Sequence, residues 1–167
     1  APQSNQLIRI SSSTTGVQAN GSSYSVSLSS NGYFAVFYST ANNLVTDDTN
    51  NQSDVFIYER GTGTLTRISV ASDGAQGDAP SSLGQPNGKH VSIDGRYVVF
   101  VSSATNLIAG DTNNKGDVFL RDRLTGQTIR VSQGPDGSQA NDVSNNPSIS
   151  EDSRYVAFDS AATNWIS

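Results

Sequence analysis

The stretch SIDGRYVVFVSSATNLIAGDTNNKGDVFLRDRLTGQTIRVS, residues 92–132, decides the fold because its parts recur along the chain. Its block GRYVVFVS matches GYFAVFYS at 32–39 and SRYVAFDS at 153–160. Its last residues, TIRVS, match LIRIS at 7–11 and LTRIS at 65–69. The blocks return about every 60 residues, and self-similarity at a fixed period is the signature of a repeat protein.

Each repeat is predicted to hold four short strands, because runs rich in Val, Ile, Tyr and Phe are separated by Asn-Gly, Asp-Gly and Thr-Gly turns. In their order within a repeat, the predicted strands are 24–29, 88–93 and 147–150; then 32–39, 95–102 and 153–160; then 54–59 and 117–122; and last 7–11, 65–69 and 128–132. Strands joined by such tight turns run antiparallel. We therefore expect an all-β chain of four-stranded antiparallel blades.

The composition agrees with this fold class. The chain has 167 residues, 34% of them hydrophobic and only 15% charged, and Ser, Thr, Asn and Gly are abundant. These residue types favour turns and strands over helices. The middle repeat carries about five extra residues around SSLGQPNG at 81–88, and we expect this insertion to form a surface loop.

The repeat resembles that of TolB-like, WD-repeat-like bacterial β-propellers, on the motifs DGRYV (94–98), ATNL (104–107), DTN (111–113), DVF (117–119) and RVS (130–132). The resemblance implies one propeller-type domain over 1–167. Within it we expect two complete blades in repeats 23–69 and 88–132, a partial strand at 7–11 and a partial repeat at 147–167.

Propellers contain about 4 to 8 blades, more than this chain supplies, so three explanations stay open. The chain is a fragment of a longer propeller, several copies complete a ring, or the repeats stack into a filament. The last two make self-association the expected partnership. The chain starts at Ala1 without Met, which suggests removal of a signal peptide and an extracellular, periplasmic or cell-surface location.

Several partners and chemistries are not expected. The formal net charge is −5 and the ten Lys and Arg residues are scattered, so no basic track invites nucleic acid. No apolar run reaches the roughly 18 residues of a membrane span, and there is no Cys. The lone histidine, His90, falls where the other repeats have Ser27 and Ser148, and we interpret it as a partly exposed strand residue rather than a catalytic base.

Two loops of the same pattern, DTNNQSD and DTNNKGD, are candidates for calcium binding, because calcium takes 6 to 8 oxygen ligands that Asp and Asn supply at alternate positions. The resemblance also points to structural calcium. The candidate ligands are Asp48, Asn50, Gln52 and Asp54 in the first loop, and Asp111, Asn113, the carbonyl of Lys115, and Asp117 in the second. The alternative is that these side chains only cap turns by accepting hydrogen bonds from the backbone.

Other recurring residues are expected to be architectural. Phe37, Phe100 and Phe158 are predicted core residues, while Arg9, Arg67 and Arg130 are predicted to pair with carboxylates such as Asp122 or to face solvent. Trp165 replaces a repeat leucine and is expected to be buried, to anchor a partner subunit or to stack on a sugar. Sequons begin at Asn20 and Asn51.

The sequence therefore predicts a non-enzymatic extracellular or cell-envelope scaffold, stabilised by calcium and associating with itself or with another envelope protein. The alternative is a carbohydrate- or peptide-binding propeller module of a larger secreted protein. An enzyme is not expected, because the acidic residues recur with the repeat and an active site normally occurs once.

Overall fold

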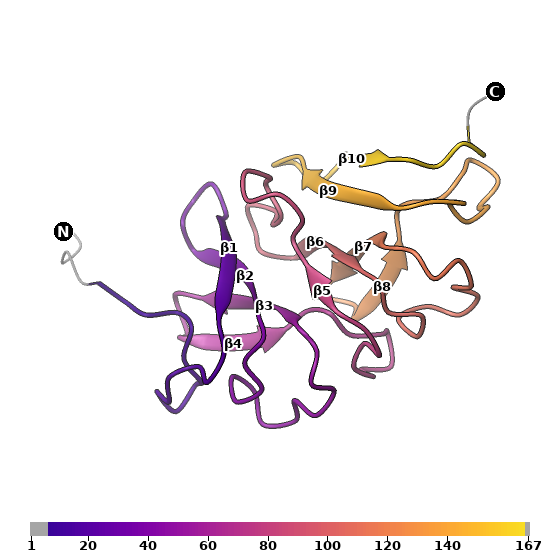
Figure 1. The fold of residues 1–167 in the computed structure, drawn as a ribbon. Helices are drawn as coiled ribbons and strands as arrows, with labels where there is room; N and C mark the ends of the chain where they lie inside the picture. Colours follow the sequence, from indigo (N-terminus) through magenta and orange to yellow (C-terminus); the bar gives the residue numbers. More distant parts are fainter. Residues whose placement is uncertain (1–6, 166–167) are drawn as a thin grey trace.

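The computed structural model describes residues 7–165 and confirms the all-β prediction. Ten strands form three antiparallel sheets, each with its strands in chain order (Figure 1). Blade 1 holds β1 (Ser23–Leu28), β2 (Phe34–Ser39), β3 (Asp54–Glu59) and β4 (Thr64–Arg67). Blade 2 holds β5 (Ser81–Ser82), β6 (Tyr97–Ser102), β7 (Asp117–Asp122) and β8 (Gln127–Arg130). Half-blade 3 holds β9 (Ser144–Ile149) and β10 (Val156–Ser160).

The insertion at 81–88 splits the first strand of blade 2. In the other two sheets this strand carries a bulge, between Tyr24 and Ser27 in β1 and opposite Ala157 and Asp159 in β9. In blade 2 the register instead passes from Ser82, paired with Val101, to an isolated bridge between Val91 and Val98. The predicted strand 88–93 is therefore wrong, since the extra residues enlarge the bulge into a loop that is exposed at 85–87.

The strand predicted at 7–11 is also absent from the described structure. Its counterparts β4 and β8 are strands because they pair with β3 and β7. Residues 7–11 have no such neighbour within residues 7–165, and only the isolated bridge between Ser12 and Gln18 follows them. An apolar alternation alone does not make a strand where no ladder is available.

The main core lies between blades 1 and 2. Val36, Val55 and Ile57 of blade 1 pack with Val98, Phe100 and Phe119 of blade 2. The opposite side of blade 1 bears a second cluster, with Phe37 and Phe56 stacked at a ring-centroid distance of 5.8 Å. Phe100 and Phe119 repeat this stack at 5.7 Å. Equivalent aromatic faces therefore point the same way along the row of blades.

His90 is buried, with 1% of its surface exposed, so its interpretation as a partly exposed residue is wrong. The insertion closes over it and touches both neighbouring blades. The Ser27 hydroxyl donates to the Gly88 carbonyl, and the Ile149 amide donates to the Lys89 carbonyl. Blade 1 and half-blade 3 are thus bridged by a loop of blade 2.

Phe158 does not join the core in the way that Phe37 and Phe100 do. Its side chain is only partly buried, and its ring meets that of Trp165 edge to face at a centroid distance of 6.0 Å. Trp165 is likewise partly buried. Trp165 thus takes part in local packing, and its contact with a partner stays a prediction. No helix within residues 7–165 is long and apolar enough to cross a membrane.

Candidate functional site: the aspartate loops

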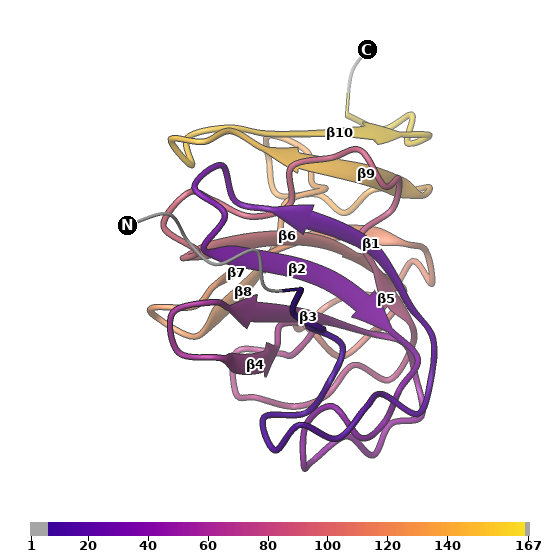
Figure 2. The same ribbon diagram turned by 90° about the vertical axis from the view of Figure 1, so that its left-hand side faces the viewer.

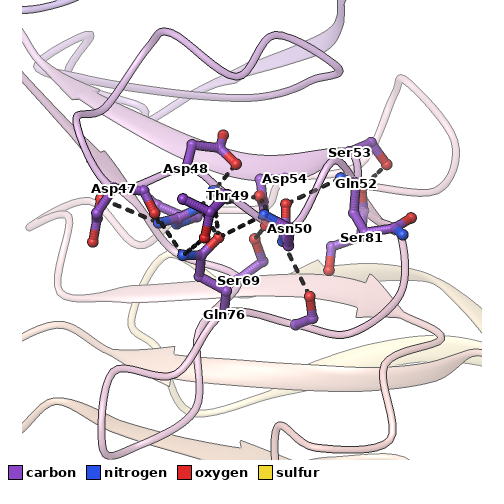
Figure 3. Close-up of polar contacts among 12 residues, drawn as sticks. Asp47, Asp48, Thr49, Asn50, Gln52, Ser53, Asp54, Ser69, Gln76 and Ser81 are labelled. Atoms are coloured by element: carbon purple, nitrogen blue, oxygen red, sulfur yellow. Dashed lines mark hydrogen bonds and ion pairs between the residues drawn. The ribbon is translucent and has the colours of Figure 1, made fainter.

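The first aspartate loop connects β2 to β3, and the third strand fixes its end. Asp54 opens β3, where its pairing with Ser39 holds the carboxylate in the sheet. Arg67, at the end of β4, lies across the ladder from Phe56. The loop before Asp54 folds over this strand end, so that Asp47, Asp48 and Asp54 gather around Arg67. Figure 3 shows the three aspartates with Asn50 and Gln76.

Arg67 is the centre of the first cluster. Its Nη1 lies 3.2 Å from Asp48 Oδ1 and 3.4 Å from Asp54 Oδ2, and its Nη2 lies 3.2 Å from Asp47 Oδ1. The side chains of Arg67, Asp48 and Asp54 are almost completely buried, whereas that of Asp47 is exposed. Two buried carboxylates thus share one guanidinium, which the planar, multi-donor shape of arginine permits.

The polar side chains of the loop are engaged in turn chemistry. Asn50 Oδ1 accepts from the Gln52 amide, while Asn50 Nδ2 donates to Asp54 Oδ2 and to the Gly77 carbonyl. Gln76, from the segment after β4, accepts the Asn50 amide at 3.1 Å. Asn51 has a positive φ of 54°, a conformation that asparagine tolerates. The side-chain oxygens therefore fix a tight turn.

The second loop repeats this arrangement with longer ion pairs. Arg130 Nη1 lies 3.7 Å from Asp111 Oδ1 and 3.8 Å from Asp117 Oδ2, and all three side chains are buried. Asn113 again receives an amide, that of Lys115, and donates to Asp117. The Lys115 ammonium points to Asp142 at 3.3 Å. Gly110 stands where the first loop has Asp47.

Burial raises the pKa of Asp48 and Asp111. In both cases desolvation is the largest cause, and the second carboxylate of the cluster, Asp54 or Asp117, adds to it. The arginine opposes both effects. Asp48 differs because neither of its carboxylate oxygens accepts a hydrogen bond from residues 7–165, whereas Gln139 Nε2 donates to Asp111 Oδ1. Asp48 is consequently less completely satisfied than Asp111, whereas Arg67 is more completely satisfied than Arg130, whose Nη1 donates no hydrogen bond within residues 7–165.

Calcium does not fit these residues as they are arranged. The ion needs 6 to 8 converging oxygens, but Asn50 turns its amide nitrogen toward Asp54, and Arg67 already bridges Asp48 and Asp54. Residues 7–165 hold no group of three or more His, Cys, Asp or Glu side chains placed to bind a metal. Calcium binding stays a prediction, and the geometry supports turn chemistry around a buried ion pair.

The residues that organise both loops were outside the predicted site. They are the arginine of the fourth strand, the glutamine of the Gly-x-Gln motif and a serine, namely Arg67, Gln76 and Ser69 in blade 1 and Arg130, Gln139 and Ser132 in blade 2. Each recurs at a fixed place in the repeat, a signal that could have found them. Asp122, the partner expected for the repeat arginines, pairs instead with Arg96 at 2.7 Å.

The comparisons with known proteins bear on the fold. No protein-family model matches the sequence, and neither does any curated protein. Among solved structures, one described as "putative TolB from Agrobacterium tumefaciens" is similar, with a TM-score of 0.50 and 16% sequence identity. The similarity covers 82% of this chain but 38% of that one. With the three sheets described above, it shows that this chain has the fold of TolB-like β-propeller blades.

Proposed function

We propose that this chain is a non-enzymatic scaffold or interaction module of the cell envelope or the extracellular space, and that it associates with copies of itself through its blades. One observation carries the proposal. The outer face of blade 1, turned away from blade 2, is apolar; Ala35 and Phe37 in it are buried, whereas Val26, Leu28 and Tyr33 are exposed. Figure 2 shows this sheet facing the viewer, with no other sheet in front of it.

The repeat provides an internal control for this exposure. Leu28, Val91 and Ile149 occupy the same position of three successive repeats. Val91 is 5% exposed because it lies in the core shared with blade 1, and Ile149 is 2% exposed in β9, which packs against β6 of blade 2. Leu28 is 60% exposed. The same repeat position is therefore buried in blade 2 and half-blade 3 but exposed in blade 1. Exposed apolar patches often mark interaction sites.

The rest of the outer face is only partly covered. Ile10 and Ala19 of the N-terminal segment pack against the Phe37 and Phe56 cluster, while Val26 and Tyr33 remain exposed. The aspartate loops support a structural role, because the same arrangement recurs in both blades and an arginine of the blade itself pairs with the buried carboxylates. We include an envelope location in this proposal because the fold is TolB-like.

The proposal is tested by the native mass as a function of concentration. Sedimentation velocity from low to high micromolar protein should show the 17.6 kDa chain shifting to larger species, in calcium and in chelator alike if the arginine clusters are self-sufficient. Loss of the larger species in chelator would instead assign calcium a part in assembly. A monomer at every concentration would reject self-association.

A further inference from the structure

We infer that two copies of this chain meet head to tail, with Tyr155 of half-blade 3 in one copy entering a pocket on the outer face of blade 1 in the next. This inference rests on the proposed self-association and specifies its contact. It commits to a second copy as the occupant, because one chain carries both the pocket and the side chain that fits it, at opposite ends of the row of blades (Figure 1).

The contact between blades 1 and 2 is the template. Phe34, at the start of β2, packs against the core that blade 2 completes. Arg123 lies over the Phe34 ring, with its guanidinium carbon 5.5 Å from the centroid. Gly95 is so close that a Cβ atom there would lie 2.5 Å from the ring. One aromatic side chain of the preceding blade is thus held by a glycine and an arginine of the next.

Blade 1 repeats the receiving half of this contact. Gly32 and Arg60 stand at the repeat positions of Gly95 and Arg123, and both line a pocket with Leu28 and Tyr58. The pocket measures about 190 Å³, and a cavity of about 150 Å³ accommodates benzene. No atom of residues 7–165 lies within 4 Å of the position that a Cβ on Gly32 would take. The space that corresponds to the one Phe34 fills on blade 2 is therefore a pocket on blade 1, and Ile8 and Ile10 of the N-terminal segment form part of its wall.

Half-blade 3 supplies the entering side chain. Tyr155 stands at the repeat position of Phe34 and is 63% exposed. The guanidinium carbon of Arg154 lies 5.3 Å from the centroid of its ring, and Arg154 Nη2 donates to its hydroxyl; such cation–π contacts are attractive. Its neighbours on β10 that share its side of the strand are Ala157 and Asp159, so Tyr155 projects beyond small and polar surroundings.

The two surfaces differ, which makes the contact heterologous. Such contacts produce a closed ring if the rotation between copies closes and a filament if it does not. A heterologous contact also predicts that a copy whose pocket on blade 1 is disabled can still donate Tyr155, and that a copy without Tyr155 can still accept one in its pocket. This property separates the inference from a face-to-face dimer through blade 1, which would use the same surface of both copies.

Two single variants and one control test the inference by sedimentation velocity. Leu28→Glu disables the pocket and Tyr155→Ala removes the entering ring; each is expected to weaken association by more than about tenfold, as truncated aromatic anchors do. Leu124→Glu alters another exposed leucine, in the β7–β8 turn, and should associate like the parent. Thermal unfolding of each variant checks that the fold is retained.

Mixing the two disabled variants gives the decisive result. An equimolar mixture should form a dimer of about twice 17.6 kDa and grow no further, because only the Leu28→Glu copy has a tyrosine to donate and only the Tyr155→Ala copy has a pocket. If Tyr155→Ala associates like the parent, the inference is overturned while self-association stands. A parent that never associates overturns both, and leaves the outer face to another partner.

Discussion

The two aspartate loops follow one plan and differ in how fully it is satisfied. In blade 1, Arg67 lies 3.2 Å and 3.4 Å from two buried carboxylates and also reaches Asp47. In blade 2, Arg130 lies 3.7 Å and 3.8 Å from its pair, and Gln139 takes up part of the charge of Asp111. An arginine pairs with the buried carboxylates in both blades. The hydrogen bonds around each cluster then determine how much stability is lost when that arginine is removed.

The largest expected difference lies in removing that arginine. Arg67→Ala leaves Asp48 and Asp54 buried without a cation, and breaking a buried ion pair in this way costs about 3–5 kcal/mol. Arg130→Ala should cost less, because its contacts are longer and Gln139 still bonds Asp111. Urea unfolding of the two variants measures both values. Equal losses would show that the shorter contacts in blade 1 carry no additional stability.

Calcium sharpens the same comparison. With the guanidinium removed, Arg67→Ala exposes three carboxylates to one another, and a bound cation would relieve their repulsion. Calcium at 100 times its dissociation constant would then stabilise the variant by about 2.7 kcal/mol, seen as a rise in Tm that a chelator reverses. The parent protein should respond little. A similar rise in the parent would establish the calcium site that the sequence predicts.

The serines beneath the clusters should show no difference between the blades. Ser69 and Ser132 each accept a buried amide, that of Val55 or Val118, at 3.0 Å and donate to the first aspartate of the strand. Ser69→Ala and Ser132→Ala each leave that amide unpaired, at a cost of about 1–3 kcal/mol. Denaturant midpoints that differ strongly between the two variants would mean that the two serines contribute unequally to the stability of the fold.

The smallest effect concerns the insertion that distinguishes blade 2. Burial lowers the pKa of His90 below 6.5, so the unfolded chain binds its proton more readily than the folded chain. The neutral, buried histidine therefore contributes to the free energy of unfolding. This contribution is fully present above pH 6.5 and is lost as the pH falls through 6.5 toward the pKa of the folded state. Stability measured between about pH 5 and 8 should therefore slope more steeply in the parent than in His90→Leu. Parallel profiles would contradict this.

The raised pKa values of Asp48 and Asp111 act in the opposite direction. Their ionised forms disfavour the folded state, so this cost is relieved as the pH falls through their folded pKa values. Both aspartates are present in the parent and in His90→Leu, so the difference between the two profiles isolates the histidine.

The sequence alone determined the class of fold and its repeat, because these depend on local information. Strands β2, β3, β6 and β7 lie where the apolar blocks predicted them, since alternating side chains and tight turns suffice to specify such hairpins. Asp48 and Asp111 lie in the loops before β3 and β7, and Asp54 and Asp117 open these strands. The position of each of these strands is specified by neighbouring residues in the sequence and by pairing with one adjacent strand.

Tertiary structure decided everything that depends on a distant partner. Residues 7–11 carry a strand pattern but lack a ladder, and 88–93 is interrupted by a bulge that the insertion enlarges. Arg67 is 13 residues from Asp54, and only the pairing of β3 with β4 brings them together. Leu28 and Val91 obey the same local rule and differ only in whether another blade lies against them. Exposure, and with it the interaction surface, is therefore a property of the packed blades.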